Sequence, residues 1–180
     1  QGDWSSDVCS SDLHVSRLGY FCVRGSESDV LSRYLMAART VNADVIVRIT
    51  GDCPLIDPAL VDLVIAQFNT EGVDYMSNVK PATYPDGLDI EVFTLEALER
   101  ACRESQDPFD HEHVTPYLRK PGLYKTAAMQ YGEDLSGLRW TVDEPADFEV
   151  VSQVFAHFAP NIHFSWTEVL GLQCSQPTLF

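Results

Sequence analysis

Residues 44–58 read DVIVRITGDCPLIDP, and this stretch decides the fold. Its first half is β-branched and apolar almost without interruption, which is typical of a strand buried on both faces of a sheet. A Gly-Asp turn follows, and Asp57 and Pro58 then supply the cap and the first-turn proline that begin a helix. A buried strand that leads through a short turn into a helix is the repeating unit of an α/β fold.

The alternation of strands and helices continues on both sides of that stretch. Period-2 and continuous apolar runs predict strands over residues 20–23, 44–50, 73–77, 88–93, 125–130 and 138–142. Capping residues and apolar residues at helical spacing predict helices from Ser28 or Asp29 to about Val41, from Asp57, from Thr94 to about Ser105, and from Asp143, with a helical turn around residues 113–118. This order predicts a three-layer α/β domain with a mostly parallel sheet.

The composition excludes several classes of protein. The chain has 180 residues, of which 45% are hydrophobic and 22% charged, as in a globular domain with a core of its own. Its 27 acidic and 12 basic residues give a net charge of −15, and a domain this acidic repels nucleic acid unless it carries a basic patch. No apolar run has the length of a membrane span. We therefore expect neither a nucleic acid nor a membrane as partner.

The cysteines give no sign of a disulfide framework or a zinc module. They are odd in number and widely spaced, at Cys9, Cys22, Cys53, Cys102 and Cys174. The sequence shows no basic segment followed by an apolar run, which is the pattern of a signal peptide. Reduced thiols in the cytoplasm are the resulting expectation.

The first 13 residues, QGDWSSDVCSSDL, differ in kind from the rest of the chain. They have no hydrophobic period, and residues 3–13 resemble the conceptual translation of a common sequencing-adapter oligonucleotide. We interpret residues 1–13 as a non-native artefact outside the fold, the alternative being a natural disordered tail. The domain is then expected over residues 14–172, and residues 173–180 are expected to form an unstructured or out-of-frame tail.

Two acidic residues directly follow buried strands. Asp52 comes after the strand of the opening stretch, and Asp143 comes after the strand over residues 138–142. Mg²⁺ prefers a few carboxylate oxygens and leaves its other positions to water and phosphate, so two aspartates at neighbouring strand ends are candidate ligands. Turn and helix-cap roles explain the same residues equally simply.

The segment YPDGLDIEVF offers further candidates in Tyr84, Asp86, Asp89 and Glu91. Its Pro-Asp-Gly sequence is a turn signature, and the alternation that follows places Asp89 and Glu91 on one face of a strand. That face either lines a site or is simply solvated.

The segment HEHVTPY, residues 111–117, is not a zinc motif. It lacks the HExxH spacing and has no cysteine nearby, so a substrate contact or a hydrogen bond within a loop is the better interpretation of His113. The chain also lacks the glycine-rich signatures of dinucleotide and P-loop sites and the GxSxG motif of serine hydrolases.

Six motifs in order carry a family resemblance. VRGSESDVLSRY, VRITGDCPLIDP, DYMSN, YPDGLDIEVF, EHVTPY and LRWTVDEPADFEVV together resemble the sugar cytidylyltransferases. The nearest branch is that of spore coat polysaccharide biosynthesis proteins, related to the acylneuraminate and 3-deoxy-manno-octulosonate cytidylyltransferases. The resemblance runs from about Val23 to about Phe158.

The resemblance implies a glycosyltransferase-A-like, Rossmann-related fold and Mg²⁺-dependent transfer of CMP from CTP to a sugar. It gives Asp52 and Asp143 the catalytic metal-binding role, and it places Arg48 and Gly51 on the nucleotide side. On the sugar side it places Tyr84, Asp86, Glu91 and His113. The resemblance leaves open whether the protein forms a homodimer.

The resemblance fails in two places. The family opens with a strand and a nucleotide-binding loop of the type QARxGSxRLPGK, which this chain lacks, so we expect a partial and nearly inactive domain. His111 stands where relatives of this branch often carry Arg. A non-catalytic sugar-nucleotide binding module and a glycosyltransferase of the same fold remain alternatives, although a glycosyltransferase would more typically show a DxD motif.

Overall fold

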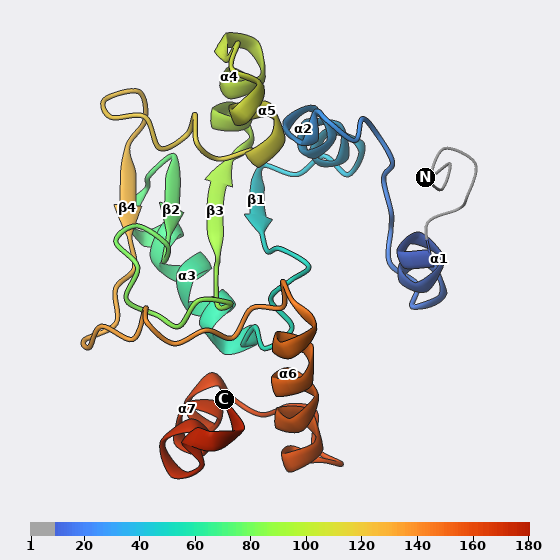
Figure 1. Cartoon of the computed structure of the whole chain (residues 1–180). Helices are drawn as coiled ribbons and strands as arrows, with labels where there is room; N and C mark the ends of the chain where they lie inside the picture. Colours follow the sequence, from blue (N-terminus) through green and yellow to red (C-terminus); the bar gives the residue numbers. More distant parts are fainter. Residues whose placement is uncertain (1–9) are drawn as a thin grey trace.

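The computed structural model describes residues 10–180, and its centre is a four-stranded mixed sheet (Figure 1). The strands follow one another across the sheet in the order β1 (Val45–Arg48), β3 (Glu91–Thr94), β2 (Tyr75–Ser77) and β4 (Thr126–Ala128). Strand β3 pairs antiparallel with both of its neighbours, and β2 pairs parallel with β4. The expected α/β class is confirmed, but the expectation of a mostly parallel sheet is corrected to a mixed one.

The reversed strand has a local cause. No helix separates β2 from β3, so the chain returns from the end at which β2 stops and enters the sheet in the opposite direction. The buried Asn78 side chain closes this return, because it donates to the Leu88 carbonyl at 2.6 Å and accepts from the Ile90 amide at 2.8 Å. The other three strands run in one common direction.

The helices begin largely where the capping residues predict. The Asp29, Asp57 and Thr94 side chains accept from backbone amides at the starts of α2, α3 and α4. None of the helices in residues 10–180 combines the length and the apolar character that crossing a membrane needs. Their bounds are α1 (Ser10–Arg17), α2 (Val30–Thr40), α3 (Pro58–Glu71), α4 (Leu95–Glu104), α5 (Pro108–His113), α6 (Pro145–Phe158) and α7 (Trp166–Ser175), with a 3₁₀ turn over Pro177–Leu179.

Two expected strands are absent. Residues 20–23 form no strand, whereas the turn expected around residues 113–118 is present at residues 116–119 and follows a helix, α5, that was not predicted. Residues 138–142 lie extended but join no strand, and only an isolated bridge pairs Arg139 with Asp86. Each segment depends on partners far along the chain, which local sequence patterns do not report.

The two faces of the sheet pack against different helices. Met76 and Val92 point into a cluster with apolar residues of α3, α6 and α7, whereas their neighbours Tyr75 and Phe93 point into a cluster with residues of α2, α4 and the segment that follows α5. Successive residues of a strand face opposite ways, so the sheet lies between two helical clusters. In Figure 1, α6 and α7 lie beyond the ends at which β1 and β4 terminate.

The C-terminal residues are structured. The Trp140 indole donates to the Gln173 side chain at 2.7 Å, and Leu179 and Phe180 pack against the core cluster of α3, α6 and α7. The expectation of an unstructured tail over residues 173–180 is therefore wrong. The sequence patterns did not predict helix α7, although Ser165 and Glu168 form a capping box at its start.

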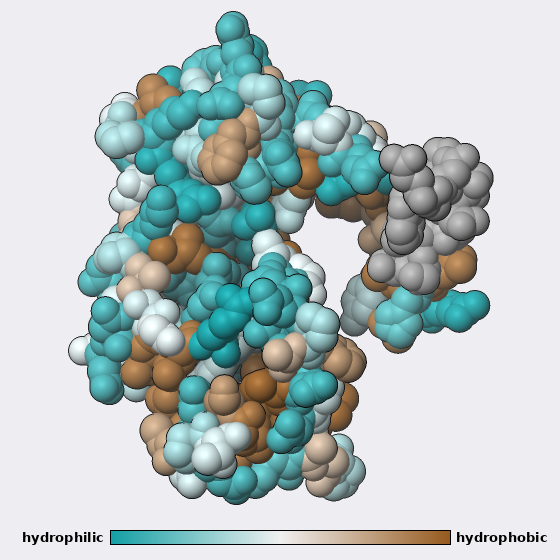
Figure 2. All heavy atoms as spheres, viewed as in Figure 1, coloured by the Kyte–Doolittle hydropathy of each residue, from teal (hydrophilic) through white to brown (hydrophobic). Residues whose placement is uncertain are grey.

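The N-terminal arm, residues 10–28, leaves the body of the molecule in Figure 1, and Figure 2 shows open space between the arm and the sheet. Residues 1–9, which include most of the segment interpreted as an artefact, lie outside the described residues. A pocket of about 450 Å³ separates Phe21 and Val23 from α2 and β1. Among the described strands β1 pairs only with β3, so its other edge is open.

At Gly87 the loop after β2 packs closely against the backbone of residues 140–141, and this contact gives a direct test of the fold. Its φ is +104°, and a Cβ atom would lie 2.6 Å from the Trp140 carbonyl carbon. We expect Gly87→Ala to lower the free energy of unfolding by at least about 2 kcal/mol in chemical denaturation. Gly137→Ala is the control, because nothing lies within 4 Å of a Cβ there. Equal stabilities of the two variants would contradict this packing.

Candidate active site

One row of residues crosses the sheet at the end where β1, β2 and β4 stop. Arg48 pairs with Glu91, Glu91 pairs with Ser77, and Ser77 pairs with Ala128. Ligands of open α/β sheets bind beyond the carboxyl ends of the strands. The loop after β1 and the extended segment 138–142 both reach this end of the sheet.

The structure brings the Asp52 and Asp143 segments together. The Asp52 carbonyl accepts from the Val142 amide at 2.8 Å and from the Thr141 hydroxyl at 3.2 Å. Asp143 directly follows Val142 in the chain, and its side chain is 52% exposed. The two aspartates that the sequence singled out therefore sit on adjoining backbone segments beyond the end of β1.

Asp52 is held as a carboxylate. The Thr50 hydroxyl beside it lowers the pKa of this carboxyl more than partial burial raises it. The Cys53 thiol also donates to the Asp52 carboxylate, at 3.5 Å. Burial raises the pKa of Cys53 to about 11, so the thiol stays protonated and Asp52 is the charged group of the pair.

Arg139 orients Asp143. Its guanidinium donates to Asp143 at 2.8 Å and to Asp147 at 2.8 Å, and it lies 3.9 Å from Asp86. Asp147 in turn accepts from the Asp143 and Glu144 amides, both at 2.9 Å. Arg139 and Asp147 were not among the predicted site residues, although an Asp in the first turn after a Pro-started helix is a recognisable capping signal.

Asp89 lies in the same acidic environment. Burial, together with the nearby carboxylates of Asp86, Glu91 and Asp52, raises its pKa to about 6. Sequence reasoning noticed Asp89 but did not select it, and its alternation with Glu91 was the available signal. The accumulated negative charge beside Asp52 favours a bound cation.

Glu91 and Arg48 are engaged with each other. Glu91 is 2% exposed, accepts from the Arg48 guanidinium at 2.6 Å and from the Tyr75 hydroxyl at 2.5 Å, and lies 3.6 Å from Arg119. The Arg48 Nε atom is buried without a partner among the described residues. The predicted nucleotide-side arginine and sugar-side glutamate thus form one ion-pair cluster at the carboxyl ends of the strands.

The remaining candidates are spread out. Tyr84 is buried in an aromatic cluster, with its ring centre 5.5 Å from that of Trp166 and 5.6 Å from that of Tyr131. His113 is exposed at the end of α5, where its ring lies 4.3 Å from that of Phe109. Gly51 is exposed, and nothing lies within 4 Å of a Cβ at this position, so its surface is open to a ligand.

A pocket of about 540 Å³ adjoins Asp52. Gly51, Asp52, Pro54 and Val142 line one side, and α6 lines the other with Phe148, Val151, Ser152 and Phe155. Figure 2 shows hydrophobic side chains gathered over the region of α6 and α7. The pocket therefore joins an acidic rim to an apolar wall.

The donor set fits Mg²⁺. No group of three or more His, Cys, Asp or Glu side chains within residues 10–180 is arranged to hold a metal by itself. Mg²⁺ usually takes one or two protein carboxylates and completes its octahedron with water and substrate phosphates. Asp52, held ionised, and the exposed Asp143 supply oxygen ligands of the kind that such a site needs.

The Glu91 cluster can be tested by charge removal. Glu91→Gln keeps an acceptor for Tyr75 but leaves two guanidinium groups without their counter-ion, so we expect a loss of about 3 kcal/mol in the free energy of unfolding. Asp89→Asn, two residues before Glu91, is the matched control, because its charge is disfavoured by its neighbours and its loss should not destabilise the fold. Urea denaturation at pH 7 measures the free energy of unfolding of both variants. If Asp89→Asn were destabilised and Glu91→Gln were not, the assignment of Glu91 as the stabilising carboxylate would be wrong.

Several known proteins are similar to this chain. A family model described as cytidylyltransferase matches residues 6–150. A Methanocaldococcus jannaschii protein is 39% identical over 84% of this chain and 60% of its own length, and the Bacillus subtilis spore coat polysaccharide biosynthesis protein SpsF is 29% identical over 96% of this chain and 74% of its own length. The chain thus spans about 60% of the archaeal relative.

Two solved structures are also similar. A cytidylyltransferase from Leptospira borgpetersenii superposes with a TM-score of 0.89 at 32% identity, over 94% of this chain and 72% of that one. CMP:2-keto-3-deoxy-manno-octonic acid synthetase, solved in complex with CTP, has a TM-score of 0.57 at 16% identity, over 81% of this chain and 76% of that one, and it supports the fold alone. With its mixed sheet, its paired aspartate segments and these matches, the chain belongs to the cytidylyltransferase family.

Proposed function

We propose that this protein, at the length its relatives have, is a Mg²⁺-dependent sugar cytidylyltransferase of the cytoplasm. A sugar hydroxyl attacks the α-phosphorus of CTP, the bond from that phosphorus to the bridging oxygen breaks, and pyrophosphate leaves. The observation that carries the proposal is the bond between the Asp52 carbonyl and the Val142 amide, which sets Asp52 beside Asp143 in a member of this family. The name of the Bacillus relative supports a place in surface polysaccharide biosynthesis.

The catalytic work of this chain is positioning and charge compensation. Asp52 and Asp143 would hold Mg²⁺, which when bound neutralises the triphosphate and polarises the phosphorus under attack. Arg139 keeps the Asp143 carboxylate aimed through its 2.8 Å hydrogen bond. Gly51 leaves its backbone open to the nucleotide, and Arg48 stands at the end of β1 as a further contact on the nucleotide side.

The sugar lies on the side of Glu91 in this proposal, with Asp86 and His113 at its periphery and Tyr84 shaping the wall from the core. A pocket of about 190 Å³ lies on that side, and its lining includes the two cations Lys80 and Arg119 and the hydroxyl groups of Ser77 and Thr126. Cations at one pocket of a chain with a net charge of −15 favour an acidic sugar. An amino-modified sugar is the second substrate class to assay.

The nucleotide requires more than residues 1–180 supply. The resemblance to the sugar cytidylyltransferases implies a preceding loop whose Arg and Lys would hold the triphosphate, and this chain spans about 60% of the archaeal relative. We expect residues 1–180 alone to be nearly inactive, and the chain extended with such an N-terminal segment to release pyrophosphate from CTP in the presence of a sugar. Robust turnover by residues 1–180 alone would contradict the need for the loop.

The aspartate pair is tested in the extended chain. We expect Asp52→Asn and Asp143→Asn each to lower kcat at least about 100-fold, because either change removes a metal carboxylate. Asp62→Asn, an exposed position on α3, is the control and should keep full activity. Pyrophosphate release with a panel of acidic and amino sugars, with and without a chelator, is the measurement.

Each alternative has its own outcome in that assay. CTP binding without turnover on any sugar would favour a non-catalytic sugar-nucleotide binding module. Transfer of a sugar from a preformed nucleotide sugar would favour a glycosyltransferase. Full activity of both aspartate variants in chelator would overturn the metal-dependent proposal.

A further inference from the structure

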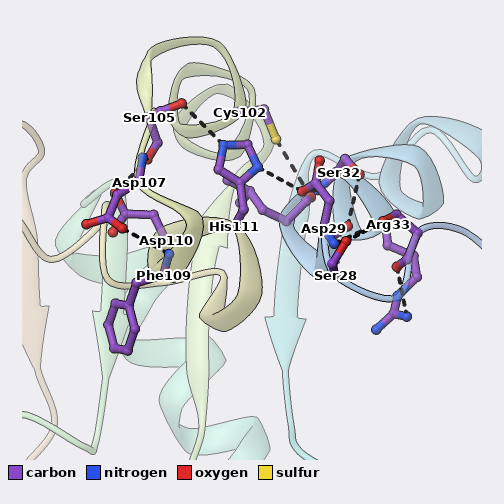
Figure 3. A network of polar contacts seen from close by, with 12 residues as sticks. Ser28, Asp29, Ser32, Arg33, Cys102, Ser105, Asp107, Phe109, Asp110 and His111 are labelled. Atoms are coloured by element: carbon purple, nitrogen blue, oxygen red, sulfur yellow. Dashed lines mark hydrogen bonds and ion pairs between the residues drawn. The ribbon is translucent and has the colours of Figure 1, made fainter.

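His111 lies where three helices meet, and its ring bonds to two of them (Figure 3). From α5, its Nδ1 atom lies 2.8 Å from the carboxylate of Asp29, the N-cap of α2. Its Nε2 atom lies 3.2 Å from the carbonyl of Ser105, the C-cap of α4. The imidazole thus bridges one cap of each neighbouring helix.

Both partners of the ring are acceptors. A backbone carbonyl has no proton to donate, and Asp29 accepts as well from the Ser32 amide at 3.0 Å, which fits an ionised carboxylate. A neutral imidazole donates from one nitrogen only, so it would leave the other nitrogen facing an acceptor lone pair. The geometry is satisfied by the imidazolium, in which both nitrogens donate.

The charged groups around His111 support this state. Asp29 faces it from α2, and Asp110 contributes a second negative charge from α5. Asp110 is itself bonded to Lys120 at 2.7 Å and to the Ser105 hydroxyl at 2.6 Å. Cys102 of α4 adds no charge near neutral pH, because burial raises its pKa to about 11.

The direction of the pH effect follows from these contacts. The hydrogen bond to Asp29, followed by that to the Ser105 carbonyl, raises the pKa of His111 above its ordinary value. A raised folded-state pKa means that the bridge stabilises the fold fully below the pKa of the unfolded chain. The stabilisation is lost as pH rises through the folded-state pKa.

We propose that His111 is a pH-sensitive clasp, which as an imidazolium ties α5 to the ends of α2 and α4 and which weakens when it deprotonates. The clasp also bears on the candidate site. The chain continues from α5 to Thr115 and Arg119, and the Arg119 guanidinium donates to the Thr115 hydroxyl at 2.7 Å and lies 3.6 Å from Glu91. Loosening α5 therefore loosens the support of one cation of the Glu91 cluster.

The protonation state is tested by NMR on residues 1–180, with no activity involved. Long-range ¹H–¹⁵N spectra of the imidazole should give imidazolium shifts at both His111 nitrogens at pH 6.5, and the His111 titration midpoint should lie above the ordinary histidine value of about 6.5. Asp29→Asn should lower that midpoint and still cap α2, because Asn caps as well as Asp. A neutral single tautomer at pH 6.5, or a midpoint unmoved by Asp29→Asn, would overturn the proposal.

The stabilising effect is tested by thermal unfolding of three chains across pH 5.5 to 9. We expect His111→Gln to melt about 3 °C below the wild type at pH 5.5, with the difference closing as pH rises. His111→Arg keeps a permanent charge and planar donors, so its melting temperature should fall less than that of the wild type between pH 6 and 9. If the difference in melting temperature between the wild type and His111→Gln stays constant with pH, His111 has a packing role only and the proposal is wrong.

Discussion

The bond from the Val142 amide to the Asp52 carbonyl, 2.8 Å long, is the contact on which the candidate site depends. It joins the loop after β1 to an extended segment about ninety residues further on, and that segment has no place in the sheet. Asp86 holds the same segment through main-chain bonds to Leu138 and Trp140, and Gly87 makes room for them. Site formation therefore requires long-range loop contacts as much as it requires the sheet.

Two carboxylates only two residues apart, Asp89 and Glu91, have opposite roles because their neighbours differ. Glu91 is fully buried, but Arg48 and Tyr75 bond to it directly, so its charge is compensated where it lies. Asp89 is only partly buried, but the groups around it are mainly other carboxylates, so its ionised form is disfavoured. Burial alone does not decide the cost of a charge, since the adjacent partners determine it.

The sequence predicts what is local in this molecule. Caps such as Asp29 and Asp57, and the apolar strand before Asp52, follow from residue preferences within a few positions. The direction of β3, the burial of Tyr84 and the pairing of residues 138–142 with Asp86 depend on contacts far apart in the chain. The candidate metal ligands Asp52 and Asp143 were selected because each follows an apolar segment predicted as a strand, although only the segment before Asp52 forms one. Arg139 was missed because its role appears only once Asp143 and Asp147 lie beside it.

The distribution of charge then indicates where a cation is needed. Arg48 and Arg119 offset Glu91, and Arg139 is shared between Asp143 and Asp147. Asp52 has no basic side chain in hydrogen-bond contact within residues 10–180, and the carboxylates near it raise the pKa of Asp89. A polyphosphate approaching this end of the sheet meets uncompensated negative charge unless a cation accompanies it. In the proposed function, a divalent ion held between Asp52 and Asp143 would remove that repulsion at the point where the phosphates would bind.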